Sequence, residues 1–142
     1  MNSVCGFYCT FQRRIPVDEI VRALVLLASL GIQDVPLVQA VDKAPEFKYP
    51  RPVVSVAYVV SGEPLIYVVR SSEAFKKAAK GDARQLAATI AHEIMHIQRG
   101  AHEGPAYAEE LRVLKAFKVG GNALHRVKQA AELFRYDWPN KD

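Results

Sequence analysis

The sequence predicts a single α+β domain, residues 1–142, in which helices pack against a small antiparallel or mixed sheet. Two runs rich in β-branched and aromatic residues, 53–60 and 65–69, are separated by turn residues and predict a β-hairpin. Helix start and stop signals surround this hairpin. The length of 142 residues suits one hydrophobic core, and a hydrophobic content of 50% is ordinary for a globular domain.

The other elements follow in order from local signals. Pro16 and the acidic residues behind it open an apolar segment that predicts a helix over 16–30, ended by Gly31. Prolines recur through 35–52, which favours a connecting loop with a short helix or strand. The chain after the hairpin predicts four helices, over 72–80, 82–99, 105–119 and 122–136.

Three of these helices have candidate start signals. Asp82 with Gln85 three residues later forms a plausible capping box, Pro105 suits a first turn, and Asn122 can cap the last helix. The connection before Pro105 is short. We therefore expect the helix over 82–99 and the helix that follows it to lie side by side and antiparallel.

Composition excludes several classes of protein. No segment approaches the roughly 20 apolar residues of a membrane helix, and the amino terminus lacks a secretory signal, so we expect a cytoplasmic protein. The two cysteines, Cys5 and Cys9, are too few for a disulfide scaffold and have weak spacing for zinc. The net charge of +4 comes from scattered lysines and arginines without interleaved aromatics, so specific nucleic-acid binding is not expected.

Residues 92–96 read His-Glu-Ile-Met-His and match the pattern H-E-x-x-H. Histidines one helical turn apart share a face, so both imidazoles can bind one Zn²⁺ at about 2.0–2.1 Å. Glu93 projects toward the same edge, where it can take a proton from the metal-bound water. We predict Zn²⁺ held by His92 and His96, with Glu93 as general base.

The rest of the predicted helix agrees with a one-sided site, because its polar residues share an arc and its isoleucines occupy the opposite one. A surface helix would also be amphipathic. The alternative interpretation is therefore an exposed polar face that happens to hold two histidines. The residues of the polar arc are Gln85, Thr89, His92, Glu93, His96 and Arg99.

A third zinc ligand is needed, and the chain offers His102, Glu103, Glu109 and Glu110. If the next helix retraces the first, Glu109 and Glu110 both return to the level of the histidines. Rotation places Glu110 on an inward apolar face, whereas Glu109 points toward Arg112. A buried carboxylate needs a partner, so we favour Glu110 over His102 and Glu109. The alternative for Glu110 is a carboxylate paired with a lysine or arginine at the edge of that face.

This combination resembles the gluzincins, the zincin metallopeptidases with a glutamate ligand, in a minimal single-domain form. The resemblance rests on the 92–96 motif followed by Glu110 and covers roughly residues 53–117 in element order. It implies a zincin-like sheet whose edge strand holds an extended peptide, with His92, His96 and Glu110 as ligands and Glu93 as general base.

The metzincins are the second possibility within the same class. His102 stands where their pattern places a third histidine, but Arg99 stands at the position of their glycine. No Met-turn is apparent, since the only methionine besides Met95 is Met1.

Other polar residues have weaker support. Tyr107 and His125 are candidates for polarising a substrate carbonyl, and Arg99 for contacting a substrate carboxylate. The structural interpretation is favoured for each: a core tyrosine for Tyr107, a surface histidine for His125 and a helix-end cation for Arg99. No motif supports the functional interpretation of these three residues.

The expected function is therefore that of a zinc-dependent metallopeptidase acting on a peptide or protein substrate. The alternative is a catalytically silent zincin-like module that binds metal and serves regulation or interaction. Glu93 favours the enzyme, because a purely structural site has no use for an acid beside its ligand.

Overall fold

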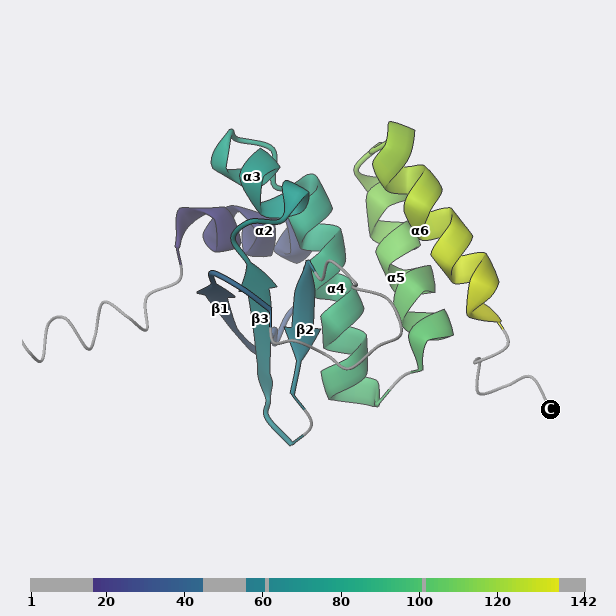
Figure 1. Cartoon of the computed structure of the whole chain (residues 1–142), viewed down its shortest axis with the longest axis horizontal. Helices are drawn as coiled ribbons and strands as arrows, with labels where there is room; N and C mark the ends of the chain where they lie inside the picture. The colour runs from purple at the N-terminus through teal and green to yellow at the C-terminus, as the bar shows by residue number, and fades with distance from the viewer. Residues whose placement is uncertain (1–16, 45–55, 61, 101, 136–142) are drawn as a thin grey trace, which may run out of the picture.

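The computed structural model describes residues 17–44, 56–60, 62–100 and 102–135. These residues form five helices and a three-stranded mixed sheet, which confirms the predicted α+β class (Figure 1). The elements in chain order are α2 (Asp18–Ser29), β1 (Leu37–Val41), β2 (Ala57–Val59), β3 (Leu65–Val69), α3 (Glu73–Ala79), α4 (Arg84–Arg99), α5 (Glu103–Ala116) and α6 (Gly121–Leu133).

The sheet has the strand order β1-β3-β2. β2 and β3 form the predicted antiparallel hairpin, with Tyr58 opposite Tyr67, while residues 53–55 of the expected first strand lie outside the described residues. β1 pairs in parallel with β3, with Leu37 opposite Leu65. This strand lies within the proline-rich connection, directly after Pro36, and gives the sheet its mixed character.

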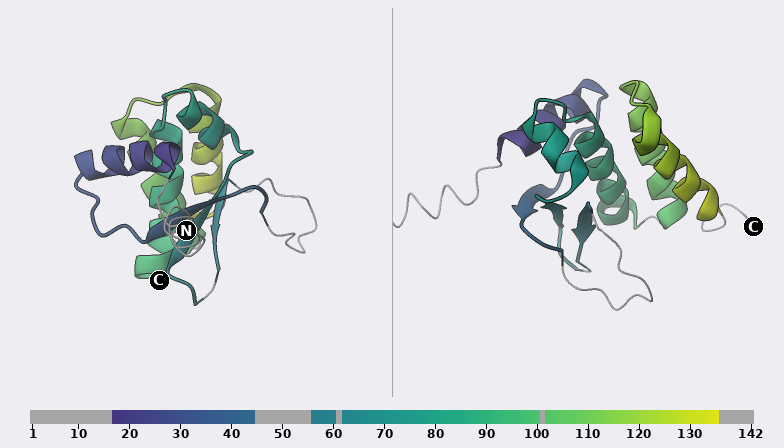
Figure 2. Two further views of the ribbon diagram at one scale, coloured as in Figure 1. Left: turned by 90° about the vertical axis from the view of Figure 1, so that its left-hand side faces the viewer. Right: turned by 45° about the horizontal axis from the view of Figure 1, so that its top comes forward.

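Helix α4 occupies the middle of the described fold. It packs against α2 and α3, against β2 and β3, and against α5. Figures 1 and 2 show the sheet on one flank of α4 and the α5–α6 pair on the other. The inward side chains of β3, Ile66 and Val68, are buried in the same hydrophobic cluster as the apolar residues of α4.

The sequence of α4 explains its central position. Every residue from 86 to 94 is buried, so this stretch is covered on all sides. Ala87, Ala88 and Ala91 present only a methyl group, which lets neighbouring elements approach closely, while Leu86 and Ile90 fill the space between them. The helix ends at Gly100, whose φ of 55° is a left-handed conformation that glycine adopts readily.

The predicted capping box at the start of α4 is wrong. The N-cap is Ala83, so Gln85 lies one position too early in the helix to complete the box. The Asp82 carboxylate instead accepts hydrogen bonds from the backbone N–H and the guanidinium of Arg84, and the side-chain oxygen of Gln85 accepts one from Lys77. Ser72 does cap α3, accepting a hydrogen bond from the Phe75 N–H at 3.2 Å.

The starts of the last two helices also differ from the predictions. α5 begins at Glu103, so Pro105 is the third residue of the first turn rather than its start. Proline fits there because the first N–H groups of a helix have no partner inside it. α6 begins at Gly121 after the N-cap Gly120, so Asn122 is not its cap.

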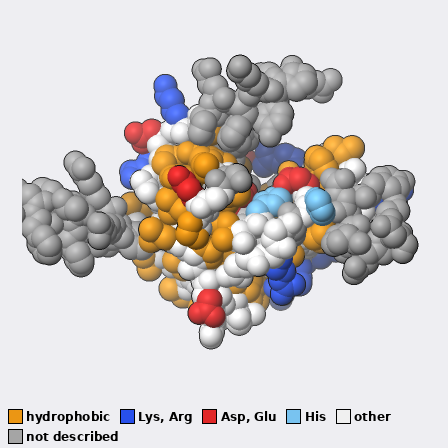
Figure 3. All heavy atoms as spheres, turned by 90° about the horizontal axis from the view of Figure 1, so that it is seen from below, with side chains coloured by type: hydrophobic (Ala, Val, Ile, Leu, Met, Phe, Trp, Pro, Cys, Tyr) orange, Lys and Arg blue, Asp and Glu red, His pale blue; other side chains and the backbone are white. Residues whose placement is uncertain are grey.

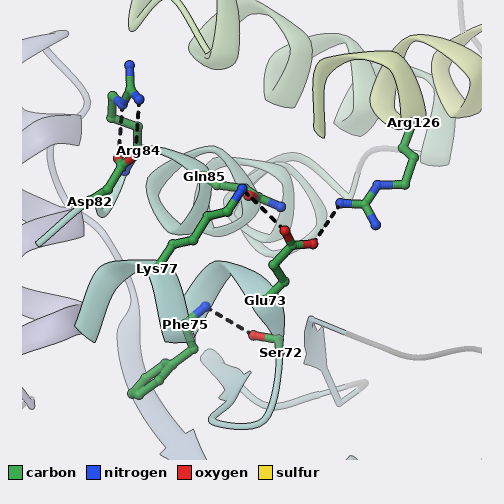
Figure 4. A network of polar contacts seen from close by, with 8 residues as sticks. All are labelled: Ser72, Glu73, Phe75, Lys77, Asp82, Arg84, Gln85 and Arg126. Carbon is green, nitrogen blue, oxygen red and sulfur yellow. Dashed lines mark hydrogen bonds and ion pairs between the residues drawn. The ribbon is translucent and has the colours of Figure 1, made fainter. Parts of the chain in front are cut away.

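Polar side chains connect helices that are distant in sequence (Figure 4). Glu73 of α3 contacts both Lys77 of the same helix and Arg126 of α6, at 3.3 and 3.2 Å. Arg84 donates a hydrogen bond of 3.0 Å to the carbonyl of Phe117, the C-cap of α5. These contacts link α6 to α3 and the end of α5 to the start of α4. Among the described helices, none combines the length and apolar character needed to cross a bilayer.

Leu114 provides a test of the packing between α5 and the core. It is completely buried, whereas Leu133 at the end of α6 is 73% exposed. Leu114→Ala should lower the free energy of unfolding by about 2–5 kcal/mol, because it removes buried methyl groups and leaves a cavity. Leu133→Ala should change it by less than about 0.5 kcal/mol. Urea unfolding of the two variants checks this, and equal losses would contradict the described packing.

Candidate metal centre

Three side chains from α4 and α5 present possible metal ligands to one point. His92 and His96 lie one turn apart on α4, and Glu103 is the first residue of α5. One ligand atom from each lies within 4.8 Å of the other two. The two Nε2 atoms are 3.2 Å apart, and Glu103 Oε1 lies 3.6 Å from Nε2 of His92 and 2.5 Å from Nε2 of His96.

These distances agree with the geometry of a tetrahedral zinc site. Two nitrogen ligands at about 2.0–2.1 Å from a tetrahedrally coordinated Zn²⁺ lie about 3.3 Å from each other. The Nε2–Nε2 separation of 3.2 Å therefore requires almost no movement of either histidine. Glu103 would have to retreat from His96 by less than about 1 Å to reach the corresponding separation. The donor set of two imidazoles and one carboxylate is common at catalytic zinc.

Glu110 occupies a different position from the one that the sequence analysis favoured. Its carboxylate lies 2.9 Å from Nδ1 of His92, on the far side of the imidazole from the Nε2 atoms. The carboxylate is close to this nitrogen but out of line with its N–H direction, so no aligned hydrogen bond forms. Glu110 therefore lies beside the second ring nitrogen of His92, which is where known metal sites place the outer carboxylate that orients a histidine ligand.

The earlier start of α5 explains why Glu103 takes the position expected for Glu110. With the helix beginning at Glu103, this residue, Tyr107 and Glu110 are spaced i, i+4 and i+7 and share one face of α5. That face lies against His92. The sequence contains this signal in the spacing of Glu103, Tyr107 and Glu110. It becomes visible only if the helix is taken to start two residues before Pro105.

The other two ligand candidates lie away from the cluster. Glu109 forms an ion pair with Arg112 on α5, as its predicted rotation required. His102 is the exposed N-cap residue of α5 and does not belong to the group of three. Among the described residues, neither of these side chains reaches the histidine nitrogens.

Glu93 is buried beside the cluster, with an exposed fraction of 8%. Among the described residues, no group forms a hydrogen bond or an ion pair with its carboxylate. Burial raises the pKa of Glu93, and the charges of Glu103 and Glu110 add to the rise while His92 and His96 oppose it. A carboxylate in this environment is ready to accept a proton, which is the property required of a general base.

Attraction between opposite charges shifts the pKa values of His92 and Glu103. Burial lowers the pKa of His92, but its contacts with Glu103 and Glu110 outweigh this and raise the pKa from 6.5 to about 10. The contacts with His92 and His96 hold the pKa of Glu103 at about 2. A cation binding to the nitrogens must displace protons from this network, because imidazole binds metal only in its neutral form.

The burial of α4 argues against the interpretation of its polar arc as an ordinary exposed face. His92 is 6% exposed, and Thr89 and Glu93 are buried as well, because α5 covers this side of the helix. The cluster still reaches the surface through His96 and Glu103, whose side chains are 19% and 39% exposed. Figure 3 shows histidine and acidic side chains together on this face, beside a hydrophobic area.

Tyr107 is the one further candidate that lies next to the cluster. Its ring packs edge-to-face against His92, with ring centres 4.5 Å apart. His125 lies exposed on α6, and Arg99 lies exposed at the end of α4. Cys5 and Cys9 lie outside the described residues.

No protein-family model, curated protein or solved structure matches this chain. The resemblance to gluzincins therefore stays a prediction based on the 92–96 motif and its surroundings.

Alanine variants of the four candidates that follow the 92–96 motif distinguish the possible third ligands. Glu103→Ala should lower zinc affinity by more than about a hundredfold, and Glu110→Ala by about 10–100-fold, the usual cost of losing a residue that orients a ligand. Glu109→Ala and His102→Ala should leave the affinity unchanged and serve as controls. Competition titration with a zinc chelator measures all four. A greater loss in Glu110→Ala than in Glu103→Ala would return Glu110 to the ligand set.

Proposed function

We propose that this chain is a zinc-dependent peptidase that hydrolyses peptide bonds in a peptide or protein substrate. The proposed ligands are His92, His96 and Glu103, with Glu93 as general base and Glu110 as the carboxylate that orients His92. The observation that carries this proposal is the convergence of three ligand atoms within 4.8 Å beside a buried carboxylate. Glu103 here replaces Glu110, the ligand expected from the sequence.

The number of ligands favours catalysis over a structural role. Structural zinc sites usually have four protein ligands, whereas catalytic sites have three and leave one position open. Three ligands come together among the described residues, and His96 and Glu103 remain partly exposed to solvent. A Zn²⁺ ion bound there would act as a Lewis acid and lower the pKa of water at the open position.

Glu93 supplies the proton-transfer group. Its carboxylate lies between the two proposed histidine ligands in the sequence and is buried, and no described residue forms a hydrogen bond or an ion pair with it, an arrangement that costs free energy in the folded state. Its raised pKa favours accepting a proton from the attacking water and later donating it to the leaving amine. A module that only bound metal would gain nothing from this buried acid.

The sheet supports a peptide as the substrate class. β2 forms one edge of the described sheet and packs against α4, the helix that carries both histidines. Because the Val69 N–H donates to the Val56 carbonyl, alternation along the ladder directs the main-chain groups of Ala57 and Val59 away from β3. These groups are placed to pair with an extended peptide added as a further strand.

Glu93→Gln tests the catalytic role directly. The substitution keeps the shape of the side chain and removes the base, so peptidase activity on a broad peptide library should fall by about a hundredfold or more. Zinc content and melting temperature should stay nearly unchanged. Glu109→Gln makes the same chemical change outside the cluster and should keep full activity. Zinc-loaded wild type without activity on the library would instead support a metal-binding module.

Proline substitutions in β2 test the substrate strand. Ala57→Pro removes an outward N–H, so kcat/KM for peptides should fall about three- to tenfold, the value of roughly one hydrogen bond. Tyr58→Pro removes an N–H directed to β3 and should mainly lower the melting temperature. Unchanged kcat/KM in a folded Ala57→Pro variant would contradict strand addition at this edge.

A further inference from the structure

Three aromatic rings contact one another in a row that begins at the end of α6, passes through α5 and ends at His92 of the proposed metal centre. The ring of Tyr107 on α5 lies edge-to-face against the imidazole of His92 on α4, at 4.5 Å and an interplanar angle of 75°. On its other side Tyr107 stacks nearly parallel to Phe134, the C-cap residue of α6, at 5.6 Å and 16°. Both arrangements are among the preferred geometries of aromatic pairs.

We infer that Tyr107 and Phe134 are positioning residues that hold the imidazole of His92 in the plane required for metal binding. The inference rests on the proposed metal centre and extends it to α6, which contributes none of the proposed ligands. Phe134 acts through Tyr107, and Tyr107 acts through direct contact with His92.

His92 needs such a support because its polar contacts do not fix the tilt of its ring. Glu103 and His96 lie near Nε2, where the metal would bind. Glu110 lies 2.9 Å from Nδ1 at the other edge of the ring, and this contact alone does not prevent the ring plane from tilting about the line between its two nitrogens. Tyr107 is the aromatic side chain that packs on the ring from α5 and blocks it from tilting in that direction.

Tyr107 is itself well held. It shares one face of α5 with Glu103 and Glu110, so its ring stands between two carboxylates of the site. Phe134 then covers the ring from α6 and limits its movement away from His92.

Loss of this support should change metal geometry more than it changes the fold. Ligand residues need to be held within a few tenths of an ångström of their productive positions, and packing residues around them provide this precision. A tyrosine that only filled the core would affect the melting temperature but not the coordination of a metal that is already bound.

Co²⁺ is a suitable probe because its visible absorption reports coordination geometry. Purified chain stripped of metal would be titrated with Co²⁺ for the wild type and for Tyr107→Phe, Tyr107→Leu and Phe134→Ala. We expect Tyr107→Leu and Phe134→Ala to weaken Co²⁺ binding about tenfold and to alter the intensity of the visible bands. Tyr107→Phe keeps the ring and should retain the wild-type affinity and spectrum.

Two controls separate positioning from stability. Leu133→Ala changes the exposed residue next to Phe134 and should leave Co²⁺ binding unchanged. In a Tyr107→Leu background, Phe134→Ala should have little further effect, because Phe134 acts through Tyr107. Circular dichroism of the metal-free variants reports whether they are folded at the titration temperature.

The outcomes distinguish this inference from the function on which it rests. Folded Tyr107→Leu or Phe134→Ala protein with wild-type affinity and spectrum would overturn the inference and leave the metal centre standing. Wild type that binds neither Co²⁺ nor Zn²⁺ would overturn the metal centre and the inference with it. If Tyr107→Leu is unfolded, the folded Phe134→Ala variant decides. An altered Co²⁺ spectrum would then support the positioning role, and an unaltered spectrum would overturn it.

Discussion

The packing of α4 against α5 is the contact on which both the fold and the candidate site depend. Alanines along α4 let its neighbours approach, and α5 covers the side that carries His92 and Glu93. Burying an imidazole and a carboxylate without partners costs several kcal/mol. Glu103 and Glu110 offset this cost for His92 through close contacts, whereas for Glu93 the charges of His92 and His96 oppose the effect of burial without any hydrogen bond or ion pair from a described residue. The protein therefore retains an energetically unfavourable carboxylate at the position that the proposed hydrolysis assigns to the general base.

Much of the fold could be predicted from local patterns. The hairpin and the order of the helices follow from β-branched runs and from start and stop residues, whose effects act within a few residues. For the proline-rich connection the sequence predicted a short helix or a short strand without distinguishing them. β1 is a strand because it pairs with β3, a long-range contact that no local signal reports. Cap residues were less predictable, since a shift of one position, as at Ala83, replaces the whole set of cap contacts.

In the candidate site, too, some positions follow from local sequence and others depend on how the helices pack. The relation between His92, Glu93 and His96 depends only on helical periodicity, so the sequence was enough to place them together. The third position depends on where α5 begins and on how it is turned, and Pro105 predicted a later start. With the start at Glu103, this candidate moves from the expected loop into the helix, and its carboxylate lies near both Nε2 atoms. Two residues at one helix end thus decide the assignment.

The three proposed ligands also lie close together along the chain, between residues 92 and 103. A metal ion held by them closes only short loops, and the conformational entropy lost in closing a loop grows with its length. Affinity for the ion would then depend mainly on one helical hairpin. α4, which carries Glu93, also packs against the sheet, α2 and α3. If the proposed function holds, a partly opened chain would keep the ion while exposing the general base, so that metal loading and competence for hydrolysis would be separable.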